Sequence, residues 1–319
     1  MKWVKSMGKK VFLLQDIADA GKKYLTDRGY QVEIGSKTDD ATIVKEAQGA
    51  EALIVRTYAC DKEIIDALPD VKIIARHGVG YDNIDIKEAA RVHKWVTNTP
   101  LANADSVAET TIMMILATAK NLSNNIEQTK LGHYDYRNTH QGLDIEGLTL
   151  GIIGYGKIGK KVAEKISGFG MNVLIYDPIT KNSEFGEVTS REELIKQSDF
   201  ISLHLPANEK TNGSFGEKEF AAMKRTAYLI NLARGSIVDE SALINAIKNK
   251  QIAGAGLDVY SKEPLPLDNP LYSFNNVILT PHIGSNTTKT MDRMALHAAM
   301  EVDRVLSGGS PKWPVNHIE

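Results

Sequence analysis

A glycine-rich turn between two apolar segments constrains the fold of this chain more than any other feature. The segment LTLGII (148–153) leads into the turn GYGKIG (154–159), a helical pattern and a second apolar run, NVLIY (172–176). The first glycine of such a turn makes it tight, the second lets backbone approach a pyrophosphate, and the third lets the helix pack on the strand. The helix amino terminus then faces the phosphate charge. The segment therefore predicts a dinucleotide-binding βαβ unit, and a glycine turn without a ligand is the weaker interpretation.

An acidic residue follows the second apolar run in the position expected for a ribose contact. Asp177 lies eighteen residues after the last glycine of the turn. A carboxylate at this place can accept hydrogen bonds from both ribose hydroxyls of NAD. We therefore predict NAD as the cofactor, bound by Gly154, Gly156, Gly159 and Asp177.

Composition excludes several classes of protein. The formal net charge of −2 argues against a nucleic-acid or anionic-membrane partner, and no apolar run approaches the ~18 residues of a membrane-spanning helix. Cys60 is the only cysteine, so no internal disulfide can form, and the eight histidines show no metal-ligand spacing. We therefore expect a cytoplasmic protein with a small-molecule substrate and no metal site.

The order of predicted elements indicates two α/β domains. Strand-like and helical segments alternate from residue 11 onward, which predicts a parallel sheet covered by helices on both faces. A long helix over 104–121 is expected to open the second domain, and residues 130–146 to form a polar loop. The last helix, from about 287 to 306, is expected to return to the first domain. The predicted boundaries are thus 1–103 with 287–319, and 104–286.

Three ionisable residues follow predicted strands of the second domain, at the sheet edge where ligands bind in open α/β folds. They are Arg234, Glu263 and His282. A guanidinium can hold a substrate carboxylate bidentately, an imidazole can exchange a hydroxyl proton, and a carboxylate beside the imidazole favours its protonated form. Each residue alone is more simply a hydrogen-bonded loop residue. Together, and downstream of a cofactor motif, they indicate 2-hydroxy-acid dehydrogenation.

The chain resembles the D-isomer-specific 2-hydroxy-acid dehydrogenases over nearly its whole length. The matching segments share the order and spacing typical of that family: RHGVGYDNIDI (76–86), NTPLANADSVAET (98–110), LGIIGYGKIGKKVAEKISGFGMNVLIYDP (150–178), DFISLHLP (199–206), NLARGSIVDESAL (231–243), AGLDVYSKEP (255–264) and TPHIGSNT (280–287). The resemblance implies a Rossmann NAD-binding domain inserted into a discontinuous, flavodoxin-like substrate domain. It also implies a homodimer joined through the NAD-binding domains and the long helix before the glycine turn.

The resemblance also implies roles for individual residues. Arg234 would bind the substrate carboxylate and carbonyl, His282 would be the general acid and base, and Glu263 its partner. The backbone of Val79 and Gly80 would contact the substrate carboxylate. Further cofactor contacts would fall on Lys157, Ile158, Leu205, Ala233, Asp258 and Gly284.

Within that family the chain is most similar to the D-3-phosphoglycerate dehydrogenases of serine biosynthesis. The similarity implies that Arg56, Arg76 and Arg137 contribute to a phosphate site. It does not extend to a C-terminal regulatory domain, so serine feedback is not expected. We therefore predict an NAD-dependent D-3-phosphoglycerate dehydrogenase, which interconverts 3-phosphoglycerate and 3-phosphohydroxypyruvate. Two alternatives remain open. One is a hydroxypyruvate or glyoxylate reductase with the same chemistry and a smaller substrate. The more remote one is a non-catalytic, NAD-sensing corepressor-like protein.

Asp177 predicts the preference between the two nicotinamide dinucleotides. A carboxylate there repels the 2′-phosphate of NADP, and one unfavourable charge contact of ~1.4 kcal/mol corresponds to about tenfold in kcat/KM. NAD(H) should therefore be preferred over NADP(H) by at least about tenfold. Steady-state kinetics with both cofactors measures this, and equal use of the two would contradict it.

Overall fold

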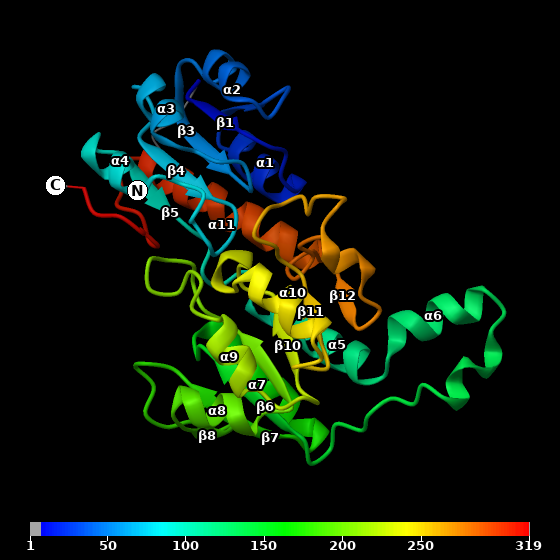
Figure 1. Ribbon diagram of the computed structural model, residues 1–319. Helices are drawn as coiled ribbons and strands as arrows, with labels where there is room; N and C mark the ends of the chain where they lie inside the picture. The colour runs from blue at the N-terminus through cyan, green and yellow to red at the C-terminus, as the bar shows by residue number, and fades with distance from the viewer. Residues whose placement is uncertain (1–7, 319) are drawn as a thin grey trace. The chain divides into compact units, whose positions relative to one another are not determined.

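The computed structural model describes residues 8–318, and the chain separates into two compact units (Figure 1). Unit 1 consists of Met1–Asn103 and Asn286–Glu319, and unit 2 of Ala104–Ser285. Each unit has its own parallel sheet, as the sequence predicts for two α/β domains.

Unit 1 has five parallel strands in the order β2-β1-β3-β4-β5, the flavodoxin-like arrangement. The strands are β1 Lys10–Leu13, β2 Gln31–Ile34, β3 Ala50–Val55, β4 Ile73–Arg76 and β5 Trp95–Thr97. The helices are α1 Asp19–Thr26, α2 Asp40–Glu46, α3 Lys62–Ala67, α4 Ile86–Arg91 and α11 Thr288–Leu306. The prediction that the last helix returns to the first domain is confirmed, because its apolar face packs in one core with β1, β3 and α1.

Unit 2 has seven parallel strands in the order β12-β11-β10-β9-β6-β7-β8, a Rossmann sheet extended by one strand. The strands are β6 Thr149–Ile153, β7 Asn172–Tyr176, β8 Glu187–Val188, β9 Phe200–Leu203, β10 Tyr228–Asn231, β11 Gly254–Leu257 and β12 Val277–Leu279. The helices are α5 Ala104–Ala119, α6 Leu122–Lys130, α7 Lys157–Ile166, α8 Arg191–Gln197, α9 Glu217–Ala222 and α10 Glu240–Lys248. Short 3₁₀ turns are η1 Tyr134–Asn138, η2 Ser167–Phe169, η3 Gly235–Ile237 and η4 Pro270–Ser273.

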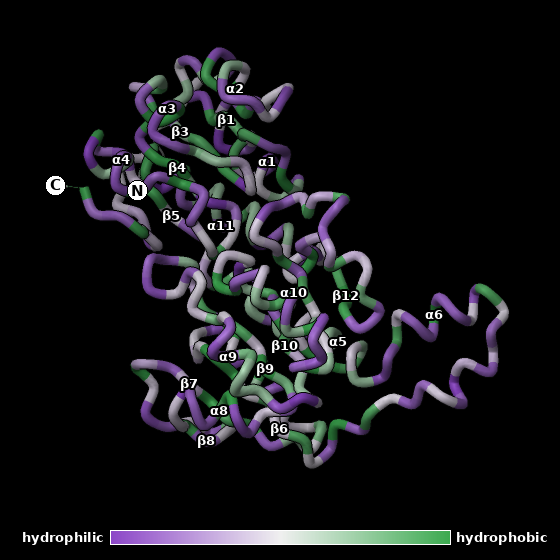
Figure 2. Tube along the Cα trace, in the orientation of Figure 1, coloured by the Kyte–Doolittle hydropathy of each residue, from purple (hydrophilic) through white to green (hydrophobic). Residues whose placement is uncertain are grey.

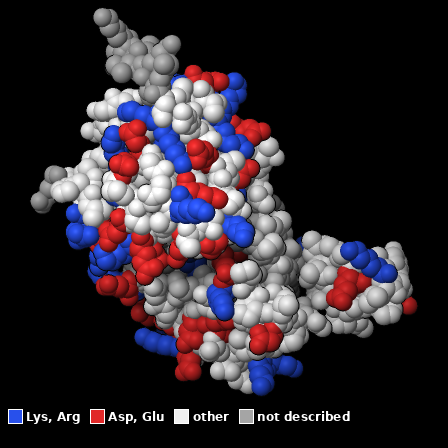
Figure 3. Space-filling model, turned by 90° about the horizontal axis from the view of Figure 1, so that it is seen from above, with Lys and Arg blue, Asp and Glu red and all other residues white. Residues whose placement is uncertain are grey.

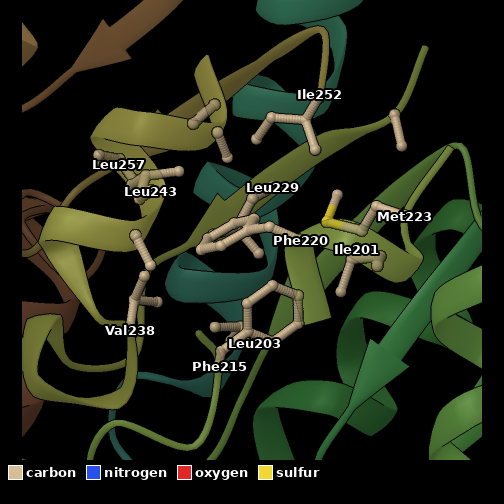
Figure 4. Packing of buried hydrophobic residues seen from close by; sticks show 14 of the residues in the cluster. Ile201, Leu203, Phe215, Phe220, Met223, Leu229, Val238, Leu243, Ile252 and Leu257 are labelled. Carbon is tan, nitrogen blue, oxygen red and sulfur yellow. The ribbon is translucent and has the colours of Figure 1, made fainter. Parts of the chain in front are cut away.

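Hydrophobic side chains fill both faces of the unit 2 sheet. Figure 2 shows apolar residues concentrated along its strands, which are buried by helices on both sides. On one face, the rings of Phe215 and Phe220 meet edge to face beneath β9 and β10 (Figure 4). This packing holds the strands rigidly, so the loops at their carboxyl ends start from fixed positions.

The segment after α5 differs from the sequence prediction. The long helix ends at Ala119 rather than 121, because Asn121 adopts a left-handed conformation with φ of 50°. Asparagine tolerates this region better than most residues, and a new helix, α6, starts directly after it. The expected polar loop contains the turn η1, and α6 with the following segment forms an arm that extends away from the sheet of unit 2 (Figure 1).

Surface charge is mixed. On the face shown in Figure 3, acidic and basic side chains are interspersed, in keeping with the net charge of −2. Among the described helices, none has the length and apolarity to cross a membrane. Within residues 8–318, no group of three or more His, Cys, Asp or Glu side chains is arranged to hold a metal ion.

Candidate active site

The glycine turn of unit 2 forms a cradle at the amino terminus of α7. Gly154 has φ of 96°, and a Cβ there would lie 2.6 Å from the carbonyl oxygen of His204. A Cβ on Gly159 would lie 2.1 Å from the carbonyl oxygen of Gly154. Both positions therefore require glycine. A Cβ on Gly156, in contrast, would meet no atom within 4 Å, so space is open in front of the helix.

The first turn of α7 is left available for an anion. Gly156 is the N-cap residue and has no side chain to accept a hydrogen bond from the helix amides. Lys157 and Ile158 are the first two helical residues, and the first turn carries no acidic side chain. Free amides and the positive end of a helix dipole bind phosphate groups, so the residues present fit a dinucleotide pyrophosphate.

Asp177 follows β7 and holds the turn in place. Its two oxygens accept hydrogen bonds from the amides of Tyr155 (2.9 Å), Ile179 (2.9 Å) and Thr180 (3.0 Å). Burial opposes ionisation of Asp177, but these amides outweigh it and lower its pKa. The Thr180 side chain also lowers the pKa of Asp177.

The other predicted cofactor residues follow one strand each, and the strands are neighbours in the sheet. Leu205 comes after β9, Ala233 after β10, Asp258 after β11 and Gly284 after β12. Because the strands are parallel, these residues lie along one edge, in line with the glycine turn after β6.

Asp258 is buried and binds the loop that follows β12. Its Oδ1 accepts hydrogen bonds from the Thr280 hydroxyl (2.6 Å) and the Ile283 amide (2.7 Å), and its Oδ2 accepts one from the Gly284 amide (2.7 Å). These contacts hold both sides of His282. The loop is thereby fixed although His282 itself has a left-handed φ of 55°, which is strained for a residue with a side chain.

Glu263 and His282 lie together at this edge. His282 Nδ1 is 2.8 Å from Glu263 Oε2, and the Tyr260 amide donates to Glu263 Oε1 at 3.2 Å. Burial opposes ionisation of Glu263. The hydrogen bond and charge of His282, the Tyr260 amide and the charge of Arg234 outweigh burial, and the pKa of Glu263 is lowered. Both side chains remain more than a third exposed, so a small molecule can reach the imidazole.

Arg234 follows β10 and belongs to the same group of charges. The buried side chain of Asn231 fixes its loop, since it accepts from the Ala233 amide (3.0 Å) and donates to the Arg234 carbonyl (2.9 Å). One guanidinium nitrogen of Arg234 donates to the Ala233 carbonyl at 2.7 Å. The sequence analysis did not single out Asn231. Its place as the last residue of an apolar strand was the available signal.

The predicted substrate residues of unit 1 lie at the carboxyl ends of β3 and β4, which are paired neighbours: Arg76 ends β4, and the others follow the strands. Within residues 8–318, the amides of Val79 and Gly80 donate to no protein group. Arg56 donates to the Asp16 carbonyl at 2.7 Å. Arg76 donates to Asn83 at 3.2 Å and to the His77 carbonyl.

The His77 side chain lies near both of these arginines. Burial lowers the pKa of His77 to about 4, and the charges of Arg56 and Arg76 act in the same direction. Both guanidinium groups therefore lie near one neutral imidazole at the carboxyl edge of the unit 1 sheet.

Arg137 lies elsewhere, in the turn η1 of the arm. Its guanidinium carbon is 4.4 Å from the centre of the Tyr134 ring, and both side chains are exposed. Within unit 2 the arm extends away from the sheet, so the fold of this unit does not bring Arg137 to the edge that carries His282 (Figure 1).

The dependence of Glu263 on His282 is directly testable. Replacing His282 with Ala removes the hydrogen bond and positive charge but leaves Glu263 partly buried, so the pKa of Glu263 should rise. Carboxyl ¹³C NMR titration measures the change. Asp177 is the control, because backbone amides rather than an imidazole lower its pKa. An unchanged Glu263 titration would show that the pair does not form in solution.

Comparison with known proteins identifies relatives over almost the whole chain. Residues 112–284 match the family model described as D-isomer specific 2-hydroxyacid dehydrogenase, NAD binding domain. A glyoxylate reductase of Korarchaeum cryptofilum is 36% identical over 97% of this chain and 96% of its own length. A D-3-phosphoglycerate dehydrogenase of Methanocaldococcus jannaschii is 35% identical over 96% of this chain, which spans 59% of that relative. A crystal structure of a glyoxylate reductase from Paecilomyes thermophila superposes with a TM-score of 0.88 at 29% identity, covering 97% of this chain and 98% of the other.

Proposed function

Since the chain belongs to the D-isomer-specific 2-hydroxyacid dehydrogenases, an NAD-dependent family, we propose that it reduces a short 2-keto acid, glyoxylate or hydroxypyruvate, to the corresponding 2-hydroxy acid. The reaction consumes one NADH and one proton per keto group. The observation that carries the proposal is the hydrogen-bonded pair of Glu263 and His282 beside Arg234, at the edge of the sheet that also bears the glycine cradle.

The glycine cradle and the first turn of α7 would hold the nicotinamide dinucleotide, which would supply a hydride for C2 of the keto acid. His282 supplies the proton to the carbonyl oxygen. Because Glu263 is ionised, the Nδ1 atom of His282 carries the hydrogen between them, and Nε2 is the atom that exchanges a proton with substrate. Glu263 stabilises the imidazolium and fixes the orientation of the ring.

Arg234 is proposed to bind the carboxylate and the keto oxygen of the substrate. A planar guanidinium suits this task because it donates two parallel hydrogen bonds and stabilises negative charge developing on oxygen. The unpaired amides of Val79 and Gly80 in unit 1 are proposed to donate to the carboxylate as well.

The contacts and placement of the three arginines predicted to form a phosphate site favour a small substrate without a phosphate. Arg56 and Arg76 are engaged by backbone and side-chain acceptors of unit 1, and Arg137 stacks on Tyr134 in the arm. Arg56 and Arg76 belong to unit 1 and Arg137 to unit 2, so neither unit by itself carries all three arginines. The relatives named glyoxylate reductase, which match this chain over nearly their whole length, support the same choice.

Oxidation of D-3-phosphoglycerate is the second candidate. Arg56 and Arg76 both lie near His77, at the carboxyl ends of the paired strands β3 and β4, and Arg76 is three residues before Val79. Two guanidinium groups near a carboxylate-binding backbone segment could hold a phosphate on the same substrate. A D-3-phosphoglycerate dehydrogenase is also among the relatives.

The chemistry is tested by replacing His282 with Gln. A general acid contributes ~10²–10⁴-fold, so the kcat for NADH oxidation with any accepted keto acid should fall by at least about 10²-fold. NADH binding, measured by fluorescence, should be retained, because the cradle lies on other residues. Activity close to that of the wild type would refute the role given to His282.

The substrate is decided by kinetics with glyoxylate, hydroxypyruvate and phosphohydroxypyruvate. We expect the wild-type enzyme to have a higher kcat/KM for glyoxylate and hydroxypyruvate than for phosphohydroxypyruvate. The Arg137→Ala variant should have the same KM for hydroxypyruvate as the wild type. The second candidate would instead be established if phosphohydroxypyruvate had the highest kcat/KM and Arg137→Ala lowered that value about tenfold. This size is expected because one charge-assisted bond contributes ~1.5–3 kcal/mol.

We also propose a homodimer that covers the arm of unit 2. The arm exposes large apolar side chains that a monomer would leave in water: Leu122, Ile126, Leu131 and Tyr134 are 47–65% exposed. Sedimentation velocity should show a dimer, and Ile126→Glu on α6 should shift it to monomer. Glu127→Gln, next to it on the same helix, is the control, and a wild-type monomer would contradict the proposal.

A further inference from the structure

Tyr260 lies where the loops of the candidate active site meet. It follows β11 by three residues, and its hydroxyl donates to the Thr280 carbonyl at 2.8 Å. Its backbone amide donates to Glu263 Oε1 at 3.2 Å. One residue thus contacts both the loop before His282 and the carboxylate that pairs with it.

These contacts close a ring of hydrogen bonds around His282. The Thr280 carbonyl that accepts from Tyr260 also accepts from the His282 amide at 3.0 Å. Glu263, which accepts from the Tyr260 amide through Oε1, accepts from His282 Nδ1 through Oε2. Tyr260 therefore fixes His282 from two sides, through its backbone and through its side chain.

The loop of Arg234 also packs directly on Tyr260. A Cβ on Gly235 would lie 1.9 Å from the carbonyl carbon of Tyr260 and 2.0 Å from its oxygen. The two backbones are therefore in contact, and only glycine fits. The Tyr260 ring packs against the hydrophobic core of unit 2, which anchors the residue.

From this geometry we propose that Tyr260 is a positioning residue. Through a closed ring of hydrogen bonds, it holds the Glu263 carboxylate and the His282 imidazole in hydrogen-bonding geometry. The proposal rests on the proposed role of His282. Tyr260 itself exchanges no proton with substrate. Its hydroxyl keeps the His282 turn, with its left-handed backbone, in the conformation in which the imidazole meets Glu263.

The hydroxyl is suited to be a permanent donor. Burial, and then the charge of Asp258, raise the pKa of the Tyr260 phenol, so it stays protonated over the working pH range. The Leu257 carbonyl lies 3.3 Å from the same oxygen. A hydroxyl has a single hydrogen, and the shorter contact to Thr280 is the stronger one.

The test is Tyr260→Phe, which removes the hydroxyl and keeps the packed ring. One neutral hydrogen bond corresponds to about fivefold in rate, so kcat for reduction should fall about fivefold with the KM for NADH unchanged. Reduction needs the imidazolium, so kcat/KM falls at high pH. In Tyr260→Phe this fall should move to lower pH, as in Glu263→Gln, because the imidazolium loses its aligned carboxylate.

Tyr272→Phe is the matched control. Its hydroxyl also donates to a backbone carbonyl, that of Leu265 at 3.3 Å, but lies outside the ring. In a Glu263→Gln background, Tyr260→Phe should lower kcat only slightly, because both residues act through the same imidazole. Equal losses in both backgrounds, an unmoved pH profile, or a Tyr260→Phe variant no different from Tyr272→Phe would overturn the inference. Retained activity of His282→Gln would instead refute the proposed function.

Discussion

Parallel pairing of the strands in unit 2 is the constraint on which the site depends. The five strands β6, β9, β10, β11 and β12 are neighbours, and all run in the same direction. Their carboxyl ends therefore share one edge, although the residues that follow them are up to about 130 positions apart in the chain. This edge places Arg234 and His282 in line with the glycine cradle of α7.

Polar side chains at the strand ends convert that edge into a rigid site. Asn231 and Asp258 are each only 1% exposed, and a buried polar group must be hydrogen-bonded to avoid a large desolvation penalty. Both satisfy this need by binding backbone groups of a neighbouring loop, and Asp258 also accepts a hydrogen bond from the Thr280 hydroxyl. The loops that Asn231 and Asp258 bind can change conformation only by leaving a buried polar side chain without its hydrogen bonds. His282 keeps its left-handed backbone conformation because Asp258 binds the residues on both sides of it.

The arginines predicted to bind a substrate phosphate are less constrained by the folds of the units. Arg56 follows β3, Arg76 ends β4, and both lie near His77, whereas Arg137 belongs to an arm that extends away from the sheet of unit 2 (Figure 1). The residues proposed for catalysis therefore lie on one sheet edge, and the arginines predicted to bind a phosphate lie at strand ends of unit 1 and on the arm. This division agrees with relatives that share the fold and carry different names.

The sequence by itself determined the two α/β units, the insertion of one into the other and the NAD motif, because these depend on local patterns: apolar periodicity, glycine at tight turns and an acid after a strand. It also pointed to Arg234, Glu263 and His282 as residues at strand ends. It missed α6, since a left-handed Asn121 leaves no distinctive pattern. Only the tertiary structure decided that Glu263 meets His282 at 2.8 Å, that three amides already bind Asp177, and that Tyr260 closes the ring around His282. Such contacts join residues from different loops, and their distances depend on how the strands pack, which no local pattern specifies.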